Sequence, residues 1–286
     1  MTRLLRAFFF RLSRDMTFKI TLIIGAGVAL FLTFLYFILD KALDSEEFKF
    51  LTGQSMLVGS LSPVQNFGIA IPVNLITYTV LEFNQGSIRN KIISGHSKAK
   101  VYLSLFISGL IFCFAMLITY VLICFGLGTI FGGFDPHGYT TSGLMLGGAE
   151  LGEFYILKLL AVTVLVYISI VAFTIFFATL FRNIGPSIPV VIMTLMVMYL
   201  LATILTTIPN LDDKVIWAAR IIDPLYAMSS SEFVVKDVIE GGEVVGQEVT
   251  VDITKETFIS GLISNTVYAL LFFFGGLVIF KKRDIK

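Results

Sequence analysis

Long uncharged apolar runs constrain this chain more than any other feature. Five stretches of about 20 residues or more carry no charge near their centres. A helix of about 20 apolar residues crosses the roughly 30 Å hydrocarbon core of a bilayer, and only a helix satisfies its own backbone hydrogen bonds there. The runs therefore predict transmembrane helices at 20–39, 101–125, 155–180, 189–208 and 259–280.

A sixth run, 64–81, is shorter and more polar, since it contains Pro72 and three Asn or Gln side chains. We interpret it as a span lined on one side by protein or water, because polar groups at membrane depth need such a lining. The predicted fold class is all-α, with one transmembrane domain over 1–286 that has six membrane helices.

Composition agrees with this class. Hydrophobic residues make up 56% of the chain and charged residues only 14%, and the mean hydropathy is +0.90. Soluble domains average about 25% charged residues, so this chain lacks the polar surface of a water-soluble protein. A formal net charge of +1 argues against the broad basic face of a nucleic-acid-binding protein.

The distribution of charge predicts the orientation. The segments 1–19, 82–100, 181–188 and 281–286 hold 14 of the 21 basic residues and 3 of the 20 acidic ones. Cytoplasmic flanks of membrane helices retain Lys and Arg. We therefore expect a multi-pass protein of the plasma membrane with both termini in the cytoplasm, and the inverted topology is disfavoured.

The first 19 residues predict a basic amphipathic helix in the inner membrane interface, because four arginines between residues 3 and 14 alternate with Leu and Phe. A signal peptide is the rival interpretation. It is disfavoured because the following apolar run is 20 residues long and lacks a small-residue cleavage site.

Two long loops are expected outside the membrane. The first, 126–154, is rich in glycine, which favours irregular structure. The second, 209–258, holds ten acidic and four basic residues. Within it, 238–253 alternates apolar and polar residues around Gly241-Gly242, which predicts a small hairpin.

The cytoplasmic loop 82–100 has the pattern of a short amphipathic helix. Ile88, Ile92 and Ile93 fall at helical spacing, and Gly95 stands where a helix would stop. Such a helix would lie flat under the bilayer and offer a surface to a soluble partner. The alternative is a solvated loop whose charge only sets the orientation.

Residues for catalysis or metal binding are scarce. A phosphate-binding loop needs Gly-Lys followed by Ser or Thr, and the sequence contains no Gly-Lys dipeptide. His96 and His137 are expected on opposite sides of the membrane, so they cannot share a metal. We therefore expect no enzyme activity, catalytic residue, metal or cofactor in this chain, and any ATP would be bound by another polypeptide.

Five polar or kinking residues in the spans are candidates for a translocation groove. The rival interpretation is that packed membrane helices tolerate Pro and Thr, and that Thr hydroxyls bond to their own backbone. The groove candidates are Pro72, Asn74, Thr77, Thr203 and Thr206.

Two stretches carry a resemblance to a known family. The loop runs in the order Glu82, Gly86, Ile88, Arg89, Asn90, Lys91, Ile92 and Gly95, followed by Lys98 and Tyr102. The chain end combines Gly275-Gly276 with Lys281-Lys282-Arg283 and then Asp284-Ile285. This order resembles the loop between the second and third helices, and the C-terminal finish, of ABC-2 type permeases.

The resemblance implies a permease subunit of an ATP-driven exporter. Its partners would be two ATPase subunits, which bind ATP and Mg²⁺, and a second permease copy or paralogue. Residues Glu82 to Lys98 named above would contact the ATPase. The cargo would be an apolar or amphipathic molecule, such as an antimicrobial or toxin-like peptide, a drug or a lipid-like molecule.

Two other functions remain open. An ion-coupled secondary transporter or channel would carry ionisable residues at mid-membrane, and an integral-membrane enzyme would carry clusters of Glu, His or Asp at that depth. The six predicted spans contain neither at their centres.

Overall fold

The computed structural model describes residues 2–43, 51–61, 70–134, 150–151, 154–207, 218–219, 221–222, 232–240 and 243–283. Most of them are helical, and five helices are long and apolar enough to cross a membrane. The chain is therefore a multi-pass helical membrane protein. The five helices are α2 (Met16–Leu43), α7 (Lys98–Gly132), α8 (Tyr155–Phe181), α9 (Ile184–Thr207) and α12 (Lys255–Lys282).

Each of these helices extends past its predicted range at one end at least. The prediction of irregular structure from residue 126 was wrong, because α7 continues to Gly132. A Cβ built on Gly132 would lie 1.2 Å from the Leu51 carbonyl oxygen, so the glycine there permits close packing. α9 begins at Ile184, and Pro189, the predicted start, is its sixth residue. Residues 135–149 lie outside the described part of the chain.

The predicted span 64–81 is only partly described. Its described part belongs to α5 (Ala70–Asn84), whose 15 residues are too few to cross a membrane alone. A second short helix, α3 (Gly53–Leu61), precedes it and is almost wholly buried against α7 and α8. The described residues thus contain five candidate spans, and the predicted count of six is not confirmed.

The N-terminal helix α1 (Thr2–Arg14) is separated from α2 by Asp15 alone. The Asp15 carboxylate accepts a hydrogen bond from the Thr17 amide at 2.9 Å, which caps the start of α2. α1 is amphipathic, as predicted, since Phe8 and Leu12 are buried and Arg6 and Arg14 are exposed. It ends at Arg14, whereas the predicted helix continued to residue 19.

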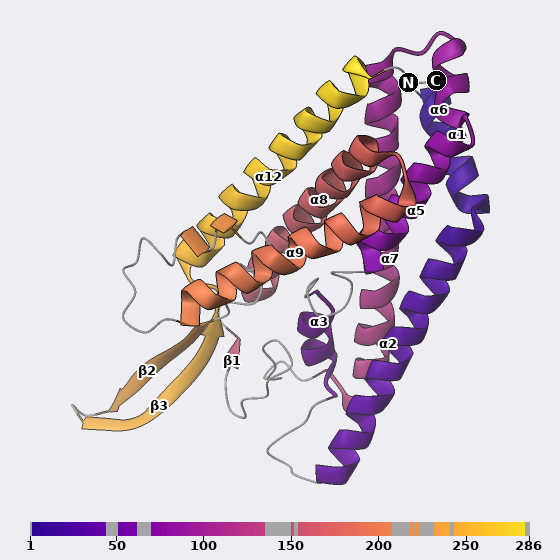
Figure 1. Ribbon diagram of the computed structural model, residues 1–286. Helices are drawn as coiled ribbons and strands as arrows, with labels where there is room; N and C mark the ends of the chain where they lie inside the picture. Colours follow the sequence, from indigo (N-terminus) through magenta and orange to yellow (C-terminus); the bar gives the residue numbers. More distant parts are fainter. Residues whose placement is uncertain are drawn as a thin grey trace.

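Figure 1 shows α2 and α7 running side by side along one flank, with α8, α9 and α12 grouped on the other. α8 is the most buried of the five long helices, and α12 packs along it. Small and polar residues line that contact, and the Ser169 hydroxyl bonds to the Asn265 amide oxygen at 2.9 Å. Such residues let membrane helices approach closely and bond across the interface.

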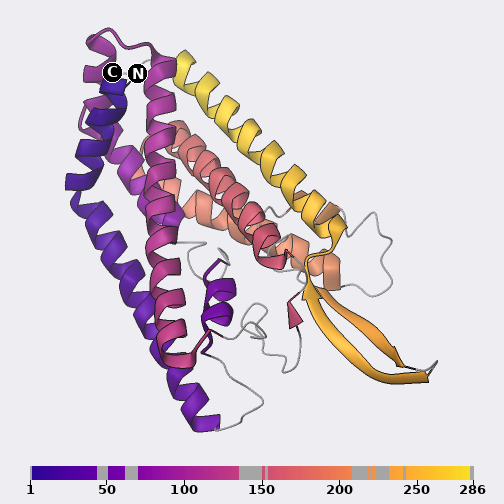
Figure 2. The same cartoon turned by 180° about the vertical axis from the view of Figure 1, so that it is seen from behind.

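The predicted hairpin is confirmed and is longer than expected. β2 (Glu232–Glu240) pairs antiparallel with β3 (Glu243–Asp252), and β1 (Glu150–Leu151) adds a parallel edge to β3. This small sheet is an addition to the all-α prediction. Figure 2 shows the hairpin projecting from the end of the molecule opposite α6 (Ser87–Ile93). The rest of the predicted loop 209–258 is only partly described.

Candidate functional site

α6 is the predicted short helix of the loop 82–100. It lies between Gly86 and Gly95, whose φ angles of 67° and 90° are left-handed and favour glycine. The Gly95 amide donates to the Ile92 carbonyl at 3.0 Å. The helix therefore ends where the sequence predicts.

The apolar face of α6 is turned toward the membrane helices. Ile88 is fully buried, and Ile92, one turn later, packs against the same core. Ile93 is 72% exposed, because five residues from Ile88 place it about 140° around the helix. Two of the three predicted isoleucines thus anchor α6, and the third remains on the surface.

Glu82, in the last turn of α5, connects α5 to both α1 and α6. Its side chain is 1% exposed. Glu82 Oε1 lies 3.1 Å from Arg11 Nε on α1, and Glu82 Oε2 lies 3.0 Å from Lys91 Nζ on α6. A buried carboxylate without partners costs several kcal/mol, so this one stabilises the site only while both cations stay in place.

Lys91 is held on two sides. Its Nζ donates to Glu82 and lies 3.1 Å from the centroid of the Phe8 ring on α1. Burial lowers the pKa of the Lys91 ammonium below its ordinary value, and the nearby Glu82 charge offsets part of that shift. A cation over an aromatic face contributes up to about 2 kcal/mol when desolvated. α6 is therefore fixed to α5 by charge and to α1 by the ring contact.

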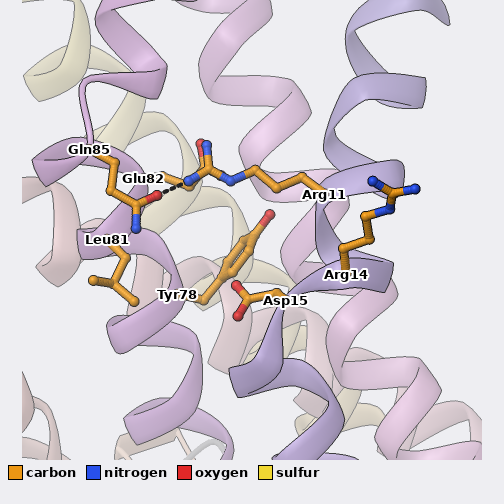
Figure 3. A pocket seen from close by; sticks show the side chains of 7 residues that line it. All are labelled: Arg11, Arg14, Asp15, Tyr78, Leu81, Glu82 and Gln85. Carbon is orange, nitrogen blue, oxygen red and sulfur yellow. Dashed lines mark hydrogen bonds and ion pairs between the residues drawn. The ribbon is translucent and has the colours of Figure 1, made fainter.

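A pocket of about 240 Å³ opens between α1 and α5. Figure 3 shows Arg11 reaching from α1 toward Glu82, in the last turn of α5, and Gln85, directly after α5. Arg11 Nη2 donates to Gln85 Oε1, in addition to the ion pair of Arg11 Nε with Glu82. The lining residues are Arg11, Arg14, Asp15, Tyr78, Leu81, Glu82 and Gln85.

The other predicted contact residues differ in their positions. Arg89 and Asn90 are exposed on α6. Lys98 instead binds the chain end, because its Nζ donates to the carbonyl oxygens of Lys281 and Arg283, each at 3.1 Å. Lys98 therefore joins the start of α7 to the end of α12.

The groove candidates belong to two separate helices. Pro72, Asn74 and Thr77 lie on α5, with Pro72 buried and the other two half-buried, and Thr203 is exposed on α9. The hydroxyls of Thr77 and Thr203 each donate, at 2.8 Å, to the carbonyl four residues earlier in their own helix. These bonds match the rival interpretation. Thr206 is also in α9, and its side chain is not among those described.

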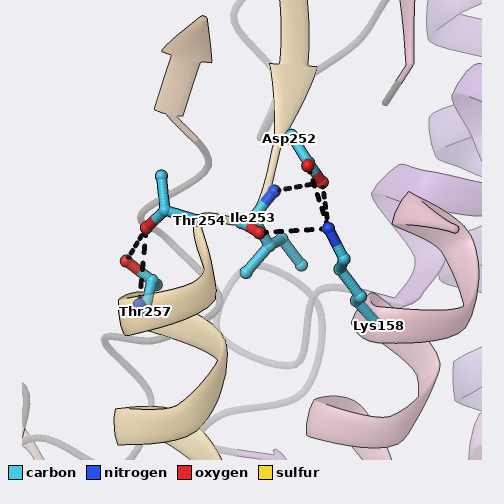
Figure 4. A network of polar contacts seen from close by, with 5 residues as sticks. All are labelled: Lys158, Asp252, Ile253, Thr254 and Thr257. Carbon is cyan, nitrogen blue, oxygen red and sulfur yellow. Dashed lines mark hydrogen bonds and ion pairs between the residues drawn. The ribbon is translucent and has the colours of Figure 1, made fainter. Parts of the chain in front are cut away.

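A second polar cluster, which the sequence did not predict, lies where the hairpin meets the membrane helices. Lys158 Nζ, in the first turn of α8, donates to both carboxylate oxygens of Asp252 at 2.8 and 2.9 Å (Figure 4). Two residues later Thr254 caps α12, since its hydroxyl accepts from the Thr257 amide at 3.4 Å. The cluster connects the end of β3 to α8 and to the start of α12.

Charged side chains of the five long helices lie within about four residues of a helix end. Among the residues that the structure describes, no group of three or more His, Cys, Asp or Glu is arranged to hold a metal ion. What the site around Glu82 can do is mechanical: it holds a short surface helix in a fixed position against two others.

A search of protein-family models and of curated proteins found no match to this chain.

Proposed function

We propose that this chain is the permease subunit of an ATP-driven exporter of the ABC-2 type, located in the plasma membrane with α6 on the cytoplasmic side. Two copies, or one copy and a paralogue, would associate with two ATPase subunits that bind ATP and Mg²⁺. The multi-pass helical fold and the resemblance of residues 82–100 to that family support this proposal.

The observation that carries the proposal is the attachment of α6. A force applied by a partner reaches the membrane helices only through a stiff, well-anchored element. Ile88 is buried in the core, and Glu82 is paired with Arg11 and Lys91 at about 3 Å. A push on α6 would therefore be delivered to α1 and α5 together.

The proposed contact residues divide into two roles. Arg89 and Asn90 are exposed and could touch an ATPase directly. Glu82 and Ile88 are buried, so they would act by positioning α6. This division differs from the set suggested by sequence, in which Glu82 is a contact residue.

The first experiment identifies the partner. The chain would be purified from native membranes in mild detergent, and mass spectrometry would identify the proteins that accompany it. We expect a nucleotide-binding subunit, and we expect vanadate with ATP to arrest transport. Transport driven by an ion gradient without nucleotide would instead support the ion-coupled carrier.

The second experiment tests the contact surface. Arg89→Glu should leave membrane insertion unchanged. It should strongly reduce the amount of ATPase that copurifies with the chain, because it reverses an exposed charge on α6. Lys100→Glu is the matched control: it reverses an exposed charge in the first turn of α7, at the end of the same loop and outside α6. If both variants associate with the ATPase as well as the unmodified protein does, α6 is not part of the interface.

The orientation needs its own test. A cysteine placed by His96→Cys should react with a membrane-impermeant thiol reagent only after cells are opened. The native cysteines, Cys113 and Cys124, are buried and would not compete for the reagent. Labelling in intact cells would place the loop outside and end the proposal.

The cargo proposal is an apolar or amphipathic peptide, drug or lipid-like molecule. Its support is the uncharged character of the membrane helices away from their ends. Export of a strongly charged hydrophilic cargo by the reconstituted transporter would contradict it.

A further inference from the structure

Glu82 and its two ion-pair partners, Arg11 and Lys91, form what we call the Glu82 cluster. A polar groove lies beside it, between α1 and α6. It has a volume of about 420 Å³, and we call it the α6 groove. Two of its lining side chains are cations and the others carry hydroxyl or amide groups, while no carboxylate lines it. The lining residues are Arg11, Gln85, Ser87, Asn90, Lys91 and Ser94.

The groove has a surplus of positive charge. Glu82 brings one negative charge to the cations Arg11 and Lys91, and this carboxylate is buried behind the groove at 1% exposure. One positive charge therefore remains unbalanced within the cluster. Burial also lowers the pKa of Lys91, and an anion in the groove would offset that loss of solvation.

Hydrogen-bond donors also face the groove. A guanidinium has five N–H donors, and in the described part of the chain Arg11 donates a hydrogen bond with one of them, to Gln85, beside its ion pair with Glu82. No described residue accepts from the side chains of Ser87 or Asn90, whereas the Ser94 hydroxyl already donates to the Lys91 carbonyl. Cations and neutral donors around one space are the partners that a phosphate group requires.

The neighbouring surface indicates where the phosphate comes from. Phe10, next to Arg11 on α1, is 55% exposed, and Ile93, three residues after Asn90 and so on the same side of α6, is 72% exposed. Large exposed apolar side chains beside cations are typical of a surface that lies in the bilayer interface. Basic pockets at that depth bind lipid headgroups.

We propose that the α6 groove binds the phosphate of an anionic phospholipid, with Arg11 and Lys91 as the cations and with Ser87 and Asn90 as neutral donors. The lipid chains would lie along the exposed side chains of Phe10 and Ile93. The inference does not depend on the proposed function, because the site belongs to this chain alone and is tested without an ATPase.

The test uses the full-length protein in mild detergent and measures lipid binding by native mass spectrometry. The probes are phosphatidylglycerol and phosphatidylcholine with the same acyl chains. We expect one phosphatidylglycerol to bind more tightly than phosphatidylcholine. Asn90→Asp should weaken that binding by about tenfold or more, because a carboxylate in the groove repels the phosphate at short range.

Two further variants make the result specific. Lys100→Gln removes one positive charge outside the groove and should leave the affinity unchanged, although it alters the net charge by the same amount as Asn90→Asp. Ser87→Asp also places a carboxylate in the groove, and it favours folding of α6 because an acid in the first turn of a helix is stabilising. This variant should weaken the binding of phosphatidylglycerol as Asn90→Asp does.

Unchanged phosphatidylglycerol binding in both Asp variants, or equal affinity for the two lipids, would overturn the proposal. Inorganic phosphate is the soluble probe. If millimolar phosphate displaces phosphatidylglycerol, the groove is a site for free phosphate and the lipid assignment is wrong.

Discussion

Replacing Glu82 with Gln would remove the one negative charge that holds α1, α5 and α6 together. The variant leaves Lys91, whose side chain is 16% exposed, and Arg11, which is 37% exposed, close together without a counter-charge. Breaking a fully buried pair costs about 3–5 kcal/mol, and an exposed pair contributes about 0–1 kcal/mol. Because the cations are partly exposed, we expect an intermediate loss of about 2 kcal/mol in the free energy of unfolding.

The buried cysteines supply the assay. Cys113 and Cys124, both on α7, become accessible to a thiol-reactive fluorophore only when the helices separate. A loss of about 2 kcal/mol should lower the apparent midpoint of thermal unfolding by about 5 °C. Arg89→Gln, an exposed change on α6, is the control and should shift the midpoint little.

A double variant tests whether the effect comes from the pair. In Glu82→Gln combined with Lys91→Gln, one of the two stranded cations is gone, so the total loss should be smaller than the sum of the single losses. If Glu82→Gln unfolds at the same temperature as the unmodified protein, or if the two changes simply add, the cluster does not hold α6 in place.

Three other changes have expected outcomes in the same assay. Gly132→Ala should lower the unfolding midpoint strongly, because its Cβ would overlap the backbone of the segment before α3, whereas Gly126→Ala meets open space and should be neutral or stabilising. Lys158→Met should cost about 1 kcal/mol or less, since Lys158 and Asp252 are both 28% exposed, and protease cleavage within the hairpin should become faster. Asn265→Leu should destabilise by about 1–2 kcal/mol, because it removes a polar bond between α8 and α12 and overfills a site with no exposed surface.

Periodicity and length made much of the fold predictable. The apolar runs located the long helices because hydrocarbon accepts only helices that satisfy their own backbone. α6 was predictable because Ile88 and Ile92 lie one turn apart and Gly95 can adopt the left-handed conformation that ends a helix. The hairpin was predictable from alternation around two glycines.

Contacts between distant segments were not predictable from one sequence. Nothing in the local pattern indicates that Arg11 and Lys91 share the Glu82 carboxylate, because the three residues belong to different helices. The extension of α7 to Gly132 was missed for the same reason. In a local sequence pattern, glycine indicates a loop. Only the close packing of Gly132 against the Leu51 backbone explains why α7 has a glycine at this position.

The length of α7 has a consequence for the membrane in which the protein works. At 1.5 Å per residue its 35 residues form a rod about 52 Å long, while the hydrocarbon layer is roughly 30 Å thick. Even a tilt of about 40°, the steepest that spans usually adopt, shortens its reach across the layer only to about 40 Å. At least one end of α7 therefore extends beyond the acyl chains. A thicker bilayer can be accommodated by burying more of the same helix in the hydrocarbon layer, without bending it.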